Sequence, residues 1–203
     1  MKKKRVFDEK RISFILIIAL LVSTISYGYV DLGYRPPSAD RIYFIHYSMS
    51  STWANRAYSA ANTWNNVNAG VKFIKGGYCH QEMDVQDSYF SVMYDSFLAY
   101  GWPADANAGF ARFNTGDYGD IVMNSLRSWG DGNSTSYLDG QGLLTHEFGH
   151  SIGLGDVYSA SDVQTGNYTD VTMYGHSDYS MLNSYGQRTL HQDDINGIRA
   201  LWP

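Results

Sequence analysis

The chain has 203 residues, which corresponds to about one domain. Hydrophobic residues make up 44% of it and aromatic residues 15%, so the composition excludes an intrinsically disordered protein. The formal net charge is −5, and −9 without residues 1–28. A chain this acidic repels phosphate backbones, so nucleic acid is not expected as a partner.

The N-terminus has the layout of a secretory signal peptide. Six basic residues within the first eleven precede the apolar run Ile12–Val22, and small residues follow up to Gly28. The run is shorter than the roughly 20 residues that a membrane span needs, so cleavage near Ser26 or Gly28 is favoured over an uncleaved anchor. We therefore predict a signal peptide over 1–28, followed by a short N-terminal segment over 29–39.

Cys79 is the only cysteine, so the chain forms no intrachain disulfide. A secreted protein without disulfides fits a bacterial source better than an animal one. We expect the mature chain to be extracellular, monomeric and without stable membrane association.

The mature chain alternates between strand-like and helix-like patterns. Strands are expected at 41–47, at 71–75 ending with two glycines, within 85–100, and at 108–113 and 120–124 around a turn at 114–119. Helices are expected at 50–64, between Asp139 and Gly153, and from Thr189, where Thr189 and Gln192 have the spacing of a capping box. This order predicts a single α+β (mixed α/β) domain over 40–203.

Most of the chemistry lies in one segment, THEFGHSIGLGD. His146 and His150 are four residues apart, so on a helix they lie on one face and can bind one Zn²⁺. Glu147 follows the first histidine and can act as general base on a water held by the metal. Gly153 can adopt a positive φ and return the chain, so that Asp156 becomes the third ligand.

Two other zinc architectures take the third ligand from elsewhere. A gluzincin uses a Glu on a later helix, but no Glu follows Glu147. An aspzincin-like site would use a distant aspartate such as Asp170 or Asp178, but the GTxxD context of that family is absent. The spacing from Gly153 to Asp156 is therefore the favoured arrangement.

Two later stretches accompany this motif: VTMYG, which contains Met173, and RTLHQDDINGIRALWP at the end of the chain. Together the three segments resemble the metzincin clan of zinc endopeptidases, and within it the matrixins. The resemblance covers roughly residues 40–203. It implies a twisted, mostly parallel sheet with an active-site helix and a C-terminal helix. It also implies a Met-turn that places Met173 beneath the metal, with Met181 as the competing candidate.

The chain departs from the matrixin pattern at three points. Asp156 stands where matrixins have histidine, and in this respect the chain resembles the snapalysins, which are small secreted bacterial metzincins. Matrixins hold a structural zinc through histidines, but the region 85–125 contains none. The segment between the predicted signal peptide and the first strand is too short for a folded propeptide, so no cysteine switch is expected.

The resemblance implies a secreted zinc-dependent endopeptidase that hydrolyses peptide bonds in proteins, with Glu147 activating a zinc-bound water. Catalytic Zn²⁺ is the expected cofactor, and the Asp- and Gly-rich turns at 114–120 and 130–139 are candidates for structural Ca²⁺. The expected partners are protein or peptide substrates. The alternatives are a snapalysin-type small metzincin and a non-catalytic secreted module that binds zinc and peptides.

Two segments are expected to contact a substrate. Strand 108–113 is a candidate edge strand that could hold an extended peptide by backbone pairing. The segment 171–186 is expected to line the pocket for the substrate side chain after the cleaved bond. The remaining histidines are expected to be ordinary surface or core residues, with His176 the best placed of them to lie near the site.

Overall fold

The computed structural model describes residues 29–33, 35–36, 38–47, 49–79, 89–95, 109–114, 117–164, 166–175 and 185–203. The predicted signal peptide lies outside these residues. So do His176, Asp178 and Met181, which were named above from the sequence, and His80, one of the remaining histidines.

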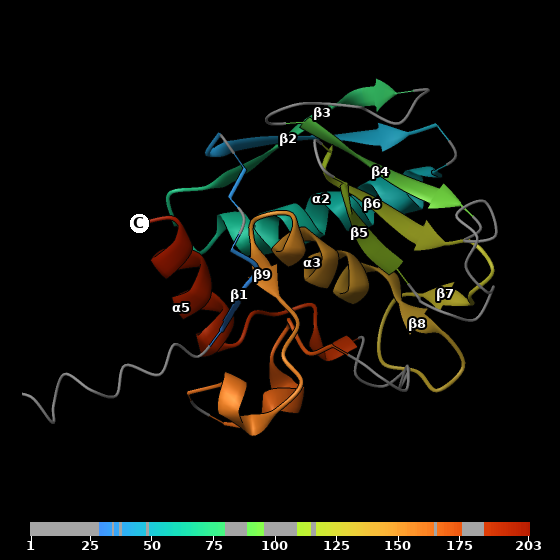
Figure 1. Ribbon diagram of the computed structural model, residues 1–203. Coiled ribbons are helices and arrows are strands. Elements are labelled where there is room, and N and C mark those ends of the chain that lie inside the picture. The colour runs from blue at the N-terminus through green and yellow to red at the C-terminus, as the bar shows by residue number, and fades with distance from the viewer. Residues whose placement is uncertain are drawn as a thin grey trace, which may run out of the picture.

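Five strands form the main sheet (Figure 1). They are β2 (Asp40–His46), β3 (Lys72–Cys79), β4 (Tyr89–Asp95), β5 (Gly109–Asn114) and β6 (Asp117–Asn124). Their order is β3-β2-β4-β6-β5, and all neighbours are parallel except β5, which runs antiparallel to β6. The sheet is therefore mostly parallel, as predicted, and β5 ends the order of the described strands.

Helices cover one face of this sheet, with α2 and α3 side by side beneath it (Figure 1). The helices are α2 (Ser51–Asn65), α3 (Gly140–His150) and α5 (Gln192–Leu201). Short strands pair as β1 (Val30–Asp31) with β9 (Leu154–Gly155) and as β7 (Trp129–Gly130) with β8 (Leu138–Asp139). The predicted α+β (mixed α/β) class is confirmed. No helix in the described part of the chain is long and apolar enough to span a bilayer.

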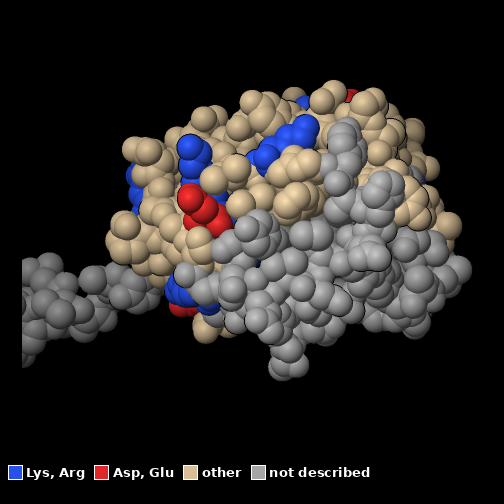
Figure 2. Space-filling view, turned by 90° about the horizontal axis from the view of Figure 1, so that it is seen from above, with Lys and Arg blue, Asp and Glu red and all other residues tan. Residues whose placement is uncertain are grey.

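The alternation of side chains along β2 explains which face of the sheet is buried. Arg41, Tyr43 and Ile45 are buried, whereas the residues between them are only partly covered, which is the two-residue period of a strand. The opposite face is seen from above in Figure 2, where its described residues carry only scattered charges. The described part of this face therefore offers no strongly charged binding surface.

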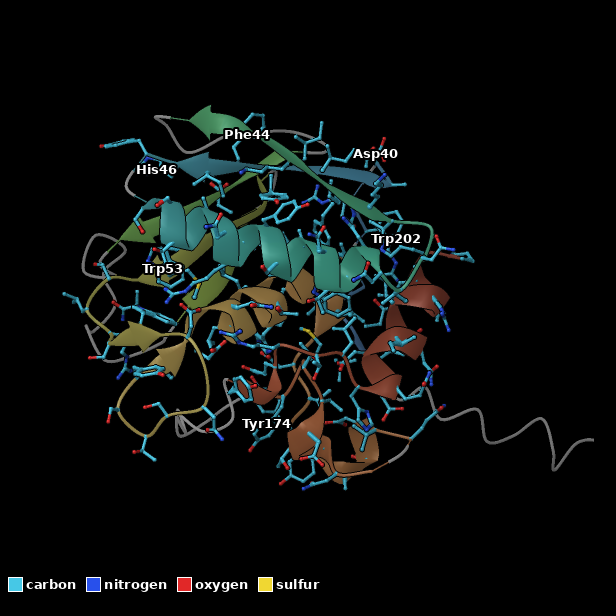
Figure 3. The ribbon with its side chains drawn as sticks, turned by 180° about the vertical axis from the view of Figure 1, so that it is seen from behind. Asp40, Phe44, His46, Trp53, Tyr174 and Trp202 are labelled. Atoms are coloured by element: carbon cyan, nitrogen blue, oxygen red, sulfur yellow. The ribbon has the colours of Figure 1, made fainter. Side chains whose placement is uncertain are left out.

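Strand β3 continues through Gly76 and Gly77, where the sequence predicted its end. The Phe44 ring, labelled in Figure 3, lies against Gly76, and a Cβ there would be 2.6 Å from Phe44 Cε1. Gly76 is thus required by the close approach of a ring and not by a turn. The predicted turn at 114–119 is also too long, because the ladder between β5 and β6 still pairs Asn114 with Asp117.

The capping box predicted for Thr189 and Gln192 is wrong. Helix α5 is capped instead by His191, whose backbone N–H donates to the Asp194 carboxylate at 2.8 Å. The Thr189 carbonyl accepts from the Thr172 hydroxyl at 2.8 Å, so this residue belongs to the loop before the helix. A carboxylate is the stronger acceptor for the orphan N–H groups of a helix start.

The core joins both central helices to the sheet. Trp64 of α2 is buried, and its Nε1 donates to the Thr145 carbonyl of α3 at 2.8 Å. Phe148 of α3 meets the rings of Tyr43 and Phe73 edge-on, with centroids 5.3 and 4.9 Å apart. These contacts hold the polar helix α3 at a fixed depth below the sheet.

Replacing Trp64 with Phe removes the hydrogen bond to Thr145 and part of the buried ring volume. We expect the free energy of unfolding to fall by about 2–3 kcal/mol. Urea denaturation of the wild type and the variant measures the change. Tyr58→Phe, at an exposed position of the same helix, is the control and should stay within about 0.5 kcal/mol of the wild type.

Candidate metal centre

Helix α3 is buried along almost its whole length although it carries several polar residues. Its N-cap is Asp139, a fully buried residue whose Oδ1 accepts from the Gly142 N–H at 2.7 Å. Arg188 donates to both oxygens of Asp139, from Nε at 2.8 Å and from Nη2 at 2.6 Å. The buried carboxylate is therefore both paired and hydrogen-bonded, and it ties the start of α3 to the segment before α5.

His146 and His150 lie one turn apart on α3, with Nε2 atoms 3.1 Å from each other. Asp156 Oδ1 lies 3.2 Å from Nε2 of His146 and 3.4 Å from Nε2 of His150. In a tetrahedral zinc site with bonds of 2.0–2.1 Å, neighbouring ligand atoms are about 3.3–3.4 Å apart. The group could hold a metal ion, and its dimensions are compatible with zinc.

Backbone carbonyls decide which ring nitrogens carry protons. Nδ1 of His146 lies 2.8 Å from the Thr172 carbonyl, and Nδ1 of His150 lies 2.8 Å from the Leu154 carbonyl. A carbonyl oxygen only accepts, so each Nδ1 carries a proton and each neutral ring presents a bare lone pair at Nε2. Two lone pairs and a carboxylate oxygen facing one another repel unless a cation lies between them. The arrangement is typical of metal-binding histidines.

The electrostatics of the group also favour a bound cation. Burial lowers the pKa of His146, but its hydrogen bond to Asp156 and the charges of Glu147 and Asp156 raise this pKa to about 9. Burial raises the pKa of Asp156, but hydrogen bonds with His146 and His150 bring it far below its usual value. In the metal-free chain the cluster therefore takes up a proton.

Glu147 occupies the next position on α3 and is only 3% exposed. Its charge is one cause of the raised pKa of His146. A carboxylate in so dry a place interacts more strongly with a neighbouring charge or proton than it would in water.

The chain turns back after α3 at Gly153, whose φ of 98° confirms the predicted positive value. Strand β9 follows and pairs with β1, with Asp31 opposite Leu154, while the Leu32 N–H donates to the Gly153 carbonyl at 3.0 Å. The segment 29–39 was predicted only as a short N-terminal segment. Its strand β1 supports β9, whose Leu154 carbonyl holds His150.

Met173 is buried against the helix that carries the histidines. A Cβ added at Gly149 would lie 2.2 Å from Met173 Sδ and 2.9 Å from Trp64 Cζ2. The side chain therefore packs against the backbone of α3 next to His150. Tyr174, which follows Met173, lies on the side of α3 away from the sheet in Figure 3.

The turn that contains Met173 is held by a buried carboxylate of α5. Asp194 accepts from the backbone N–H groups of Thr172 at 2.9 Å and of Met173 at 3.3 Å. Burial raises the pKa of Asp194, although these backbone hydrogen bonds act in the opposite direction. The position of the Thr172 carbonyl, and through it the orientation of His146, thus depends on α5.

Two further residues near the site were not singled out from the sequence. Gln187 is buried, and its Nε2 donates to the carbonyls of Thr172 at 3.0 Å and Tyr174 at 3.2 Å. The Tyr158 hydroxyl donates to Asp156 Oδ2 at 2.9 Å. No sequence motif marks Gln187, whereas a tyrosine two residues after a candidate ligand is a signal that could have been used.

The turn at 130–139, a candidate for structural Ca²⁺ from its composition, is stabilised by arginines. Arg56 donates to both oxygens of Asp131, at 3.0 and 2.9 Å, and Arg188 donates to Asp131 and to Asp139. Two guanidinium groups therefore pair with the two carboxylates of this turn. The side chains of the turn at 114–120 lie outside the described residues, except Asp120.

No protein-family model matches the sequence.

Metal binding should release a proton from the cluster. His146, with a pKa of about 9, is protonated in the metal-free chain at neutral pH, and a metal needs its bare Nε2. Zinc titrations at pH 7.5, followed by calorimetry in buffers of different ionisation enthalpy, should show about one proton released. The release should fall, and the apparent affinity should level off, as the pH rises above about 9. An apparent enthalpy that is the same in every buffer would contradict this assignment.

Alanine at Gly149 would place a methyl group against Met173 and Trp64. Glycine-to-alanine changes inside helices usually stabilise, by up to about 1 kcal/mol. Here we expect the opposite sign, a loss of about 1–3 kcal/mol in the free energy of unfolding. Gly186→Ala, with no atom within 4 Å of the added methyl, is the matched control. A Gly149→Ala variant as stable as that control would show that Met173 does not pack tightly there.

Proposed function

We propose that the protein is a zinc-dependent endopeptidase of the metzincin type, with a matrixin-like catalytic domain over 40–203 and a snapalysin-like aspartate ligand. One observation carries this proposal. His146, His150 and Asp156 bring two imidazole nitrogens and one carboxylate oxygen within 3.4 Å of one another, with the buried Glu147 beside them. The mostly parallel sheet with α3 beneath it and α5 at the end of the chain is consistent with this clan.

The donor set suits zinc better than calcium or magnesium. Imidazole nitrogen is a preferred ligand of Zn²⁺, whereas Ca²⁺ and Mg²⁺ favour sites made of oxygen alone. His146, His150 and Asp156 would hold the ion. When bound, zinc polarises a carbonyl and lowers the pKa of water towards about 7.

The chain's own residues supply the remaining chemistry. Glu147, as general base, would take the proton of the attacking water and then deliver it to the leaving amine. Its burial beside His146 holds it in one place and keeps bulk water away. The carbonyls of Thr172 and Leu154 keep the two imidazoles in the tautomer that binds metal. Met173 supports α3 by packing and takes no part in proton transfer.

The position of β5 supports a peptide substrate. It ends the order of the described strands and runs antiparallel to β6, so an extended peptide could pair with its outer edge. The described part of the predicted pocket segment ends at Gly175 and resumes at Tyr185. Secretion from a bacterium remains part of the proposal, and it rests on the basic and apolar composition of residues 1–28.

The test is hydrolysis of casein, an unstructured protein, by the purified zinc-loaded chain. We expect Glu147→Gln to lower the rate by about 10²–10⁴-fold, because general base catalysis is lost. Zinc content, measured by atomic absorption, should remain that of the wild type. Glu147→Ala, purified in parallel, reports any contaminating protease. Absence of cleavage by a wild type that holds stoichiometric zinc would favour the non-catalytic zinc- and peptide-binding module.

A further inference from the structure

The two oxygens of Asp156 have different surroundings. Oδ1 faces Nε2 of both histidines, at 3.2 and 3.4 Å, whereas Oδ2 accepts a hydrogen bond from the Tyr158 hydroxyl at 2.9 Å. The carboxylate is therefore divided between the candidate metal centre and a phenol. Because an aspartate can bind a metal through one oxygen or through both, this division bears on the coordination number.

Tyr158 is held in place although its side chain is largely in solvent, with 61% of the residue exposed. Its ring lies over Gly175, where a Cβ would be 2.5 Å from Tyr158 Cε1. Its backbone N–H donates to Asp162 Oδ2 at 3.1 Å. Just before it, the Val157 N–H donates to the Met173 carbonyl at 2.7 Å, and the Val157 carbonyl accepts from the Gly175 N–H at 3.0 Å. The backbone at Val157 and Tyr158 is thus held by hydrogen bonds, and this fixes the position from which the Tyr158 hydroxyl reaches Asp156.

We propose that Tyr158 is a positioning residue that restricts Asp156 to metal binding through Oδ1 alone. A hydrogen bond from a hydroxyl to a carboxylate is charge-assisted and stronger than a neutral one. It occupies Oδ2 and resists the rotation that would turn both oxygens towards the histidines. The proposal rests on the metal centre described above, because without a bound ion the division of the carboxylate has no chemical consequence.

Whether Asp156 binds through one oxygen or through both decides whether the centre resembles a catalytic or a structural zinc site. Catalytic zinc sites have three protein ligand atoms and keep one position for water or substrate, whereas structural sites are closed by four. His146, His150 and Oδ1 supply three atoms, and Oδ2 would supply a fourth. Tyr158 thus keeps the centre at three protein ligand atoms, the number that catalytic sites have.

Substituting Tyr158 with Phe removes the hydroxyl and leaves the ring over Gly175. We expect Co²⁺ bound to the wild type to show the intense visible absorption of a four-coordinate centre. In Tyr158→Phe, Oδ2 should join the three protein ligand atoms while water stays bound, so the centre gains a fifth ligand atom and this absorption should weaken. The zinc dissociation constant should rise by about tenfold, because removing a group that orients a ligand usually weakens metal binding by this much. Thermal unfolding of the metal-free variant should match that of the wild type, because the hydroxyl is at the surface.

Tyr185→Phe is the matched control, since it also removes the hydroxyl of an exposed tyrosine. Its cobalt spectrum and zinc affinity should be those of the wild type. If Tyr158→Phe gives the wild-type spectrum and affinity as well, the role of Tyr158 is wrong while the metal centre stands. If the wild type binds no Co²⁺, or if His146→Ala binds it equally well, the metal centre itself is wrong and the role of Tyr158 falls with it.

Discussion

The Nε2 lone pairs of His146 and His150 point to one place because backbone carbonyls hold the opposite nitrogen of each ring. These carbonyls belong to Thr172 and Leu154, which lie in different segments after α3. Much of the surrounding structure serves to place them. Antiparallel pairing with β1 supports the strand that contains Leu154, and the carboxylate of Asp194 holds the turn that contains Thr172.

Helix α3 carries polar side chains, and their burial would destabilise the fold if they had no partners. A buried polar group costs free energy unless it finds a partner, and a buried charge costs more. Arg188 neutralises the N-cap aspartate at one end, and the two carbonyls satisfy the histidines near the other. The cluster of two histidines and Asp156 could hold a metal ion, and binding of that ion would be coupled to folding.

Local patterns predicted the helices well and the strand ends less well. The recurrence of Trp53, Ala57 and Trp64 placed α2 within a residue or two of its observed bounds, because a buried helix face repeats every 3.6 residues. The end of β3 was misjudged because Gly76 accommodates a ring from the neighbouring strand. The start of α5 was misjudged because the N-cap is His191, whose backbone N–H donates to the same Asp194 carboxylate that holds the turn of Met173.

Local sequence sets the spacing of His146, Glu147 and His150 on one helix and the return of the chain at Gly153. Both depend on backbone geometry within a few residues. Long-range packing sets which nitrogen of each imidazole carries a proton and which oxygen of Asp156 faces them. It also decides that arginines stabilise the turn at 130–139. These features need partners that are distant in the chain, as Thr172 is 26 residues from His146, and no local pattern encodes such contacts.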